Sequence, residues 1–263
     1  MTTLADWLAE RPFGLAMSSG FFSFYAHTGM LSALLDRGLV PSHVAGSSAG
    51  AMVAGMWAAG LEPLALAEEL QRLRREDFWD PAIGVGLLAG KKFDAILRRL
   101  LPRERIEACR VPVRISVFDI LRRRTHVVVR GDLATAIRAS CAVPGMFQPV
   151  WTELPHGKRP CWDGGILDRA GIAEMPAGRL LFHHIAAPAP WSRTEPAIPE
   201  RANMVSLVLE KLPRPHPWAM DEGRRALGVA REATERALDQ RVDASVLRVN
   251  AGETGRTQPD HRE

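Results

Sequence analysis

The chain has 263 residues, of which 46% are hydrophobic and 24% charged, and its formal net charge is +4. This balance excludes a wholly disordered chain and a polytopic membrane protein, and the length suits one large α/β domain. Arginine clusters such as 122–124 could attract phosphate groups, but no nucleic-acid-binding motif accompanies them. We therefore expect a solvated basic surface and no nucleic-acid partner.

The N-terminal segment and the cysteines indicate the compartment. No basic stretch leads into an apolar run before Phe13, so the sequence does not support a secretory signal, and we expect a cytoplasmic protein. Cys109, Cys141 and Cys161 are odd in number and lack the paired spacing of a zinc site. We interpret them as reduced thiols without a chemical role, and we expect neither a metal nor a cofactor.

Apolar runs and helical spacing alternate along the chain. In chain order the patterns predict a helix at 4–10, a strand at 13–17, a helix at 25–35, a short strand at 44–45, helices at 49–59, 64–75 and 93–101, strands at 111–120 and 124–130, a helix at 132–139, a loop at 140–151, a strand ending in a turn at 161–165, strands at 180–185 and 204–209, a helix at 221–239 and a strand at 245–249. The proline-rich segment 187–200 is expected to be an exposed loop.

Strands that alternate with helices predict a three-layer α/β fold, with a mostly parallel central sheet covered by helices on both faces. Such a sheet places functional groups at the carboxyl ends of its strands. We expect residues 1–250 to form a single domain. Residues 251–263 are polar and lack a periodic apolar pattern, so they are expected to be a disordered tail.

The uncharged stretch 44–60, VAGSSAGAMVAGMWAAG, is long enough to raise the question of a membrane span. Its residues are mostly Gly, Ala and Ser, whereas a span favours Leu, Ile and Phe. Within it, Gly46 to Gly50 fits the G-x-S-x-G pattern, which exposes its central serine at a sharp turn from strand to helix. We therefore interpret Ser48 as a nucleophile followed by a buried helix.

A serine nucleophile needs a neighbouring base. Asp163 lies between an apolar strand and two glycines, which sets a carboxylate on a turn that other backbone can approach; an ordinary Asp-Gly turn is the alternative. A rival arrangement is a Ser-Asp-His triad completed by His183 or His184, in the chain order of the α/β-hydrolases. That fold has several strands before its nucleophile, whereas two are predicted before Ser48, which argues against the triad.

Four blocks between Phe13 and Asp168 together resemble the patatin-like phospholipases: SSGFFSFYAHTGMLSALLDRGL, GSSAG, IRASCAVPGMFQPV and DGG. The resemblance implies a Ser-Asp dyad without histidine, with Ser48 attacking an ester carbonyl and Asp163 acting as general base. It also implies a lipid or other acyl ester as substrate, an oxyanion hole made by backbone amides of the first block, and no metal. A peripheral contact with a membrane is compatible with such a substrate, and the oligomeric state stays unknown.

The first block departs from the family pattern. Where the family has three glycines and then an arginine two residues later, this chain has Ser19, Gly20 and Phe21, followed by Ser23. Either Gly20 and Phe21 present their amides in an ordinary conformation and form the oxyanion hole, or the hole is incomplete. The second case would make the chain a weak enzyme or a lipid-binding pseudoenzyme.

The phenylalanines of the same block are candidates for substrate contacts. Phe22 and Phe24, beside Phe21, could line an acyl pocket, because a lipid chain needs apolar walls. Packing of the loop against the core is the alternative for these side chains.

Overall fold

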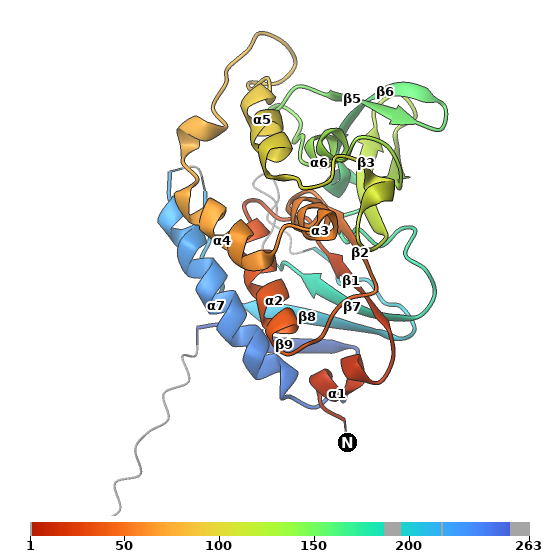
Figure 1. Cartoon of the computed structure of the whole chain (residues 1–263), viewed down its shortest axis with the longest axis vertical. Helices are drawn as coiled ribbons and strands as arrows, with labels where there is room; N and C mark the ends of the chain where they lie inside the picture. The colour runs from red at the N-terminus through yellow and green to blue at the C-terminus, as the bar shows by residue number, and fades with distance from the viewer. Residues whose placement is uncertain (1, 187–195, 217, 253–263) are drawn as a thin grey trace, which may run out of the picture.

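The computed structural model describes residues 2–186, 196–216 and 218–252, which form a three-layer α/β fold with a mostly parallel central sheet (Figure 1). The helices are α1 (Leu4–Ala9), α2 (Phe24–Asp36), α3 (Ala49–Ala59), α4 (Pro63–Arg72), α5 (Lys91–Leu100), α6 (Leu133–Ser140) and α7 (Met220–Leu238). The strands are β1 (Phe13–Met17), β2 (His43–Ser47), β3 (Val113–Asp119), β4 (Arg124–Val128), β5 (Val150–Leu154), β6 (Gly157–Asp163), β7 (Arg179–His184), β8 (Met204–Glu210) and β9 (Val246–Asn250). Three 3₁₀ turns lie at Arg75–Asp77, Ile106–Ala108 and Gly164–Ile166. The predicted fold class is confirmed.

Within the described residues the strands form one sheet in the order β5-β6-β3-β2-β1-β7-β8-β9, and β4 pairs with β3. Every pair from β3 to β9 along this path is parallel, whereas β4, β6 and β5 are antiparallel to their neighbours. The carboxyl ends of β1 and β2 therefore lie side by side near the centre of the sheet. The segments that follow them, 18–23 and the residues after Ser47, meet at this edge.

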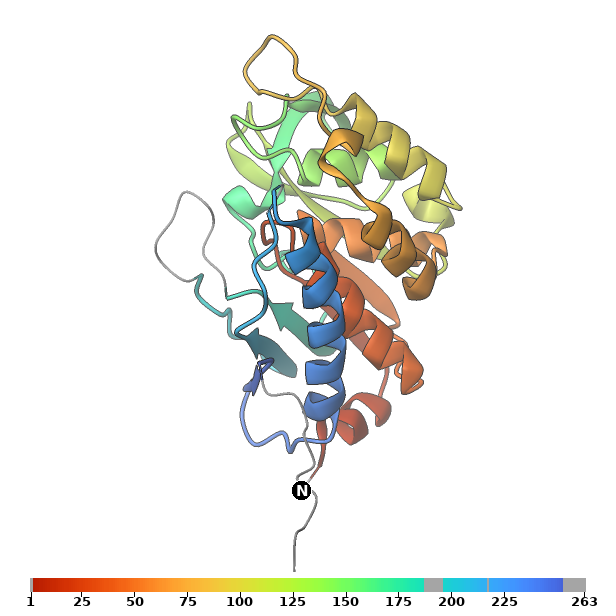
Figure 2. The same ribbon diagram turned by 90° about the vertical axis from the view of Figure 1, so that its left-hand side faces the viewer.

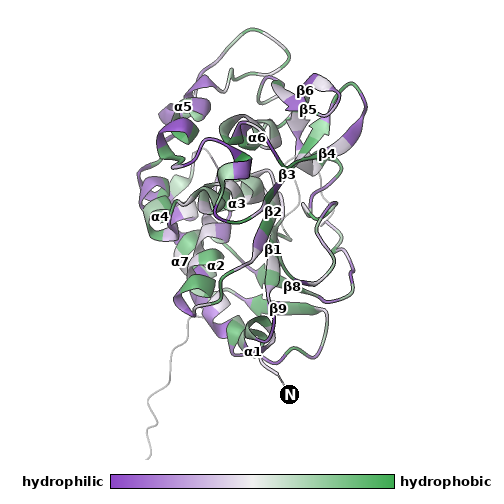
Figure 3. Cartoon of the chain, turned by 45° about the vertical axis from the view of Figure 1, so that its right-hand side comes forward, coloured by the Kyte–Doolittle hydropathy of each residue, from purple (hydrophilic) through white to green (hydrophobic). Residues whose placement is uncertain are grey.

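Side chains of the central strands alternate between two apolar clusters, as the pleat of a strand requires. Leu15 and Met17 of β1 pack into the larger cluster, together with α2, α3 and α7. Ala16, between them, packs into a smaller cluster that includes Met175 and Phe182. The hydropathy colours of Figure 3 show the contrast with the outer helices, since α5 carries much purple.

The stretch 44–60 consists of most of β2, a turn at Ser48, α3 and Gly60. All eleven residues of α3 are buried, which explains why the helix carries no charge. In the described part of the chain, no helix combines the length and the apolar character that crossing a bilayer requires.

Strand β5 is absent from the sequence prediction, which placed 140–151 in a loop. Its residues alternate strictly, but the exposed position holds Trp151, with 58% of its surface accessible, and the buried position holds Thr152, with 3%. The larger apolar residue thus faces outward, which hides the period-2 signal.

The sequence predicts a disordered tail at 251–263 and an exposed loop at 187–200. Ala251, predicted to begin the tail, is 5% exposed, and its N–H donates to the Glu210 carbonyl at 2.9 Å. Residues 253–263 lie outside the described residues, as does most of the predicted loop 187–200. The division into one domain and a tail stays a prediction.

Helices α2 and α7 pack closely along the sheet, as Figure 2 shows from the side. A Cβ atom on Gly29 of α2 would overlap the backbone carbonyl of Leu227 in α7, whereas a Cβ on Gly228 would meet nothing. The absence of a side chain at Gly29 therefore sets the distance between the two helices.

We predict opposite effects of alanine at these two glycines. Gly29→Ala should lower the free energy of unfolding by roughly 2 kcal/mol or more, because α2 and α7 must separate. Gly228→Ala should raise it by up to about 1 kcal/mol, the difference in helix propensity between the two residues. Urea denaturation of both variants measures this, and equal effects would contradict the packing argument.

Candidate active site

Ser48 lies at a strained turn between β2 and α3. Its backbone has φ 53° and ψ −120°, a conformation that L residues rarely adopt. A Cβ on Gly46 would overlap the backbone of Gly50, and a Cβ on Gly50 would overlap the carbonyl of Met17 in β1. Both glycines of the G-x-S-x-G pattern are therefore required for α3 to fold back onto the strands directly after the serine.

Asp163 comes from the end of β6 and reaches Ser48. Ser48 Oγ donates a hydrogen bond to Asp163 Oδ2 at 2.6 Å, and the Gly165 N–H donates to Asp163 Oδ1 at 2.7 Å. Burial raises the pKa of Asp163 to about 6, although these two hydrogen bonds and the positive charge of Arg169 act in the opposite direction. The carboxylate is thus ionised near neutral pH and is a stronger base than an ordinary aspartate.

Two further residues hold the turn in place. The Ser48 N–H donates to Ser140 Oγ at 2.9 Å, and Ser140 Oγ donates to the Ser116 carbonyl of β3 at 2.6 Å. The Asp163 N–H donates to the Ala142 carbonyl at 2.9 Å. The end of α6 and the residues after it therefore fix both Ser48 and Asp163; the sequence predicted that the segment 140–147, SCAVPGMF, supports the turn at Ser48.

Cys141, next to Ser140, lies beside this pair. It lines the same cavity as Ser48, and burial raises the pKa of its thiol well above the usual value, with a further contribution from the Asp163 charge. The thiol is therefore protonated near neutral pH and is a poor nucleophile.

The loop 18–23 adopts an ordinary conformation at the two residues predicted to form an oxyanion hole. Neither Gly20 nor Phe21 has a positive φ; the strained residue is Phe22, with φ 56°. Within the described part of the chain, the N–H groups of Gly20 and Phe21 have no hydrogen-bond acceptor, and both residues line the cavity that holds Ser48. Two amides beside Ser48 are thus unpaired.

Ser23 fixes the peptide between Gly20 and Phe21. The Gly20 carbonyl accepts from Ser23 Oγ at 2.9 Å and from the Ser23 N–H at 3.2 Å. In a trans peptide the N–H points opposite to the carbonyl, so these two bonds direct the Phe21 N–H away from Ser23. A Cβ on Gly20 would lie 2.6 Å from Ser23 Oγ, which explains why glycine is kept at this one position.

An apolar cavity of about 530 Å³ opens at Ser48. Phe22 and Phe24, the predicted pocket residues, both line it. The remaining apolar walls come from α3, α4, the connection between α4 and α5, α5 itself and the segment after α6: Met52, Met56, Leu66, Leu70, Leu73, Phe78, Phe93, Ile96, Leu100, Val143, Met146 and Phe147. The sequence prediction missed the walls from α4 and α5, because nothing local in those amphipathic helices marks the face that meets a ligand.

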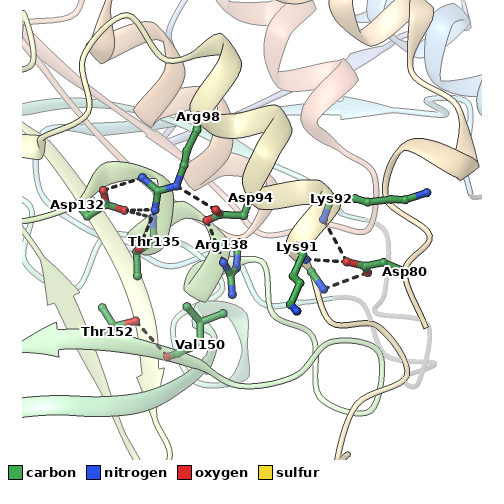
Figure 4. Close-up of polar contacts among 11 residues, drawn as sticks. Asp80, Lys91, Lys92, Asp94, Arg98, Asp132, Thr135, Arg138, Val150 and Thr152 are labelled. Carbon is green, nitrogen blue, oxygen red and sulfur yellow. Dashed lines mark hydrogen bonds and ion pairs between the residues drawn. The ribbon is translucent and has the colours of Figure 1, made fainter. Parts of the chain in front are cut away.

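Ion pairs anchor α5, and with it one wall of the cavity, to α6 (Figure 4). Asp94 accepts from Arg138 at 2.9 Å, and Arg98 bonds to Asp132, the N-cap of α6, at 3.0 Å. Asp94 also pairs with Arg98 within α5 at 2.9 Å. The pairs form one network, which fixes the position of α5 more firmly than isolated surface pairs would.

The two histidines of the rival triad form no hydrogen bond to Ser48 or Asp163 in the described structure. His183 Nδ1 is 2.8 Å from His27 Nδ1, and His27 Nε2 is 2.8 Å from the Ser18 carbonyl. Among the described residues, no hydrogen bond joins His183 or His184 to the serine or the aspartate. Burial lowers the pKa of His27 and of His184 to about 4 and holds that of His183 well below the usual value, so the three rings are neutral near pH 7.

Comparisons with known proteins agree on the kind of protein. A family model described as patatin-like phospholipase matches residues 15–175. An uncharacterized NTE family protein of Mycobacterium tuberculosis is 34% identical over 203 residues, which cover 76% of this chain and 55% of that protein. A lysophospholipase of Emericella nidulans is 25% identical over 179 residues, covering 65% of this chain and 12% of the fungal protein.

A solved structure shares the fold. VipD of Legionella pneumophila superposes with a TM-score of 0.51 at 15% sequence identity, over 87% of this chain and 67% of that one. The chain spans about half the length of the mycobacterial relatives it matches.

We predict that the reactivity of Ser48 depends on the ionisation of Asp163. The carboxylate accepts the serine proton only when it is ionised, and its pKa is raised to about 6. Labelling of Ser48 by a fluorophosphonate should therefore be constant above about pH 7 and fall about tenfold per pH unit below pH 6. A constant rate down to about pH 4, the ordinary range of an aspartate, would show that Asp163 does not control the reaction.

Proposed function

Because this chain belongs to the patatin-like phospholipase family, we propose that it is a serine acyl hydrolase that cleaves lipid or other long-chain acyl esters with a Ser48–Asp163 dyad. The observation that carries the proposal is the 2.6 Å hydrogen bond from Ser48 Oγ to Asp163 Oδ2 beside an apolar cavity. The cavity volume lies within the range of small-molecule sites, about 300–1,000 Å³. Its apolar walls suit an acyl chain.

In the proposed first step, Ser48 Oγ attacks the ester carbonyl while its proton passes to Asp163. The carbonyl oxygen becomes an oxyanion, and the ester then breaks as the alcohol leaves with the proton from Asp163. The acyl group stays on Ser48. Because the carboxylate already accepts the hydroxyl proton in a hydrogen bond, this transfer needs no rearrangement of the two side chains.

The second step releases the acid. Asp163 takes a proton from a water molecule that attacks the acyl-serine, and the proton then returns to Ser48 Oγ as the ester bond breaks. The carboxylate is regenerated, so no further group is consumed. Burial of Asp163 favours both steps, since it raises the basicity of the carboxylate.

The N–H groups of Gly20 and Phe21 are the proposed oxyanion donors. Their lack of any acceptor in the described structure leaves them available for a negative charge. The N-terminus of α3, directly after Ser48, adds a partial positive charge at the same place. Donors of this kind contribute about 3 kcal/mol each in other hydrolases.

The proposal places the protein in the cytoplasm, at a lipid surface. Support comes from Cys109, Cys141 and Cys161, which form no disulfide among the described residues, as expected in a reducing compartment. The apolar substrate cavity supports the choice of a lipid ester.

We predict that the dyad residues are essential and that the histidines are not. Ser48→Ala should abolish hydrolysis of medium-chain nitrophenyl esters, and Asp163→Asn should lower kcat by roughly 10³-fold or more, because it removes the base. His184→Ala, as the matched control, should keep most of the activity. Turnover measured on folded variants tests this.

The same assay separates the enzyme from the lipid-binding pseudoenzyme. Wild-type turnover with loss in Ser48→Ala supports the hydrolase. If the wild type neither turns over nor is labelled by a fluorophosphonate, yet binds fatty acid in the cavity, the chain is a lipid-binding protein. If Ser48→Ala is as active as the wild type, the nucleophile is another residue.

We predict that Ser23 positions the oxyanion hole, because its hydroxyl holds the Gly20 carbonyl. Ser23→Ala should lower kcat roughly tenfold with little change in KM. The Gly20–Phe21 peptide would lose its fixed orientation, which weakens hydrogen bonding to the oxyanion of the transition state and not the binding of substrate. Ser23→Thr keeps a hydroxyl and should recover part of the rate, whereas Gly20→Val should lower kcat at least as much as Ser23→Ala. An unchanged kcat in both Ser23→Ala and Gly20→Val would contradict the assignment of the hole.

A further inference from the structure

We propose that the loop Pro81–Leu88, called here the docking loop, inserts into a lipid surface and brings the cavity entrance to the bilayer. The inference rests on the proposed function, because it assigns how the lipid ester reaches Ser48. The loop has the sequence PAIGVGLL, without a single polar side chain. It projects at one end of the molecule in both perpendicular views (Figures 1 and 2).

The apolar side chains of residues 81–85 and of Leu87 face solvent, whereas Leu88 is buried and anchors the end of the docking loop. Ile83 is fully exposed, with a relative accessibility of 106%, and Val85 and Leu87 are 65% and 51% exposed. Pro81 to Val85 are five consecutive exposed residues, all apolar or glycine. A single exposed aliphatic side chain is ordinary on a protein surface, but a contiguous exposed apolar run marks a binding surface.

Backbone hydrogen bonds hold the docking loop in this exposed position. Leu87 N donates to the Gly145 carbonyl at 3.0 Å and Leu88 N to the Met146 carbonyl at 2.8 Å, while Gln148 N donates back to the Leu88 carbonyl at 3.0 Å. Gln148 Nε2 also donates to the Gly86 carbonyl at 2.6 Å. These four bonds fix the carboxyl end of the loop, residues 86–88, to the segment 145–148.

The carboxylate of Asp80, directly before the docking loop, binds the residues that follow the loop. Asp80 accepts from the N–H groups of Gly90, Lys91 and Lys92 at 3.0, 2.7 and 3.1 Å, and so caps α5 (Figure 4). The carboxylate charge next to the loop is thus directed into the helix N-terminus instead of toward a membrane.

The docking loop is continuous with the walls of the substrate cavity. Phe78, just before it, lines the cavity, and so do Met146 and Phe147, the segment to which it is bonded. The same segment follows Cys141 and Ala142, which contact the catalytic pair. A bilayer that receives Ile83 and Val85 would therefore lie against the walls that lead to Ser48.

The charges around the docking loop favour a lipid surface without net charge. Basic Arg74, Arg75, Lys91 and Lys92 flank it, and acidic Glu76, Asp77 and Asp80 nearly balance them. Attraction to anionic lipids is therefore weak, and apolar insertion dominates. The surface it fits is a phosphatidylcholine bilayer, with little dependence on salt.

Sedimentation with phosphatidylcholine vesicles tests the proposal. Replacing Ile83 and Val85 together by serine should lower the vesicle partition coefficient tenfold or more. The variant lacks the two aliphatic side chains whose transfer from water into the bilayer favours binding. Ile83→Trp should bind at least as well as the wild type, since tryptophan favours the bilayer interface. Because the replaced side chains are exposed, the thermal midpoint of unfolding should not change.

Val40→Ser is the matched control. Val40 is 59% exposed but precedes β2 at its amino end, on the opposite edge of the sheet from Ser48. Its replacement should leave vesicle binding unchanged. Equal binding by the wild type and the Ile83 Val85 double serine variant would overturn the proposal.

Two further readouts separate this inference from the proposed function. The double serine variant should hydrolyse a short, water-soluble ester at the wild-type rate, and Ser48→Ala should bind vesicles like the wild type. If no variant hydrolyses esters but the loop still governs vesicle binding, the hydrolase proposal fails and the docking surface stands. If the wild type self-associates through the loop and ignores vesicles, the surface is a contact between copies and the proposal is wrong.

Discussion

The hydrogen bond between Ser48 Oγ and Asp163 Oδ2, 2.6 Å long, joins segments from two different strands, β2 and β6. It forms only if α3 turns back sharply after β2, which requires a positive φ at Ser48 and bare backbone at Gly46 and Gly50. It also requires β6 to end where β2 ends, which the pairing of both strands with β3 provides. The sheet topology and the glycine positions can thus be understood as conditions for one contact between two side chains.

Burial of that contact has two chemical consequences. It raises the pKa of Asp163, which strengthens the carboxylate as a base, and it raises the pKa of the Cys141 thiol, which makes that thiol a poor competitor for the proposed nucleophile Ser48. The same apolar surroundings form the walls of the cavity. The proposed chemistry and the proposed substrate therefore depend on a single property of the site, the apolar side chains that surround its polar groups.

The parts of the site that the sequence predicted are those that local rules determine. The G-x-S-x-G pattern identifies Ser48 because the strained turn needs its glycines, and the two glycines after Asp163 indicate a close approach; a Cβ on Gly164 would overlap the Ser116 carbonyl. The walls from α4 and α5 act across long sequence separations, which no local pattern reports. Strand β5 was missed because Trp151 faces solvent and Thr152 faces the core. For the loop 18–23 the sequence predicted the amide donors Gly20 and Phe21 but not a role for Ser23. That role depends on a hydrogen bond to the Gly20 carbonyl, which residue types do not reveal.

A crystal structure of the protein after reaction with a long-chain fluorophosphonate tests the central claim most directly, because one map reports the nucleophile, the oxyanion donors and the acyl cavity. The account predicts phosphorus bonded to Ser48 Oγ and its anionic oxygen about 3 Å from the N atoms of Gly20 and Phe21. The alkyl chain should lie between Phe22 and the walls from α4 and α5. An adduct on another residue, or an adduct on Ser48 with both amides directed away from the phosphoryl oxygen, would contradict the account.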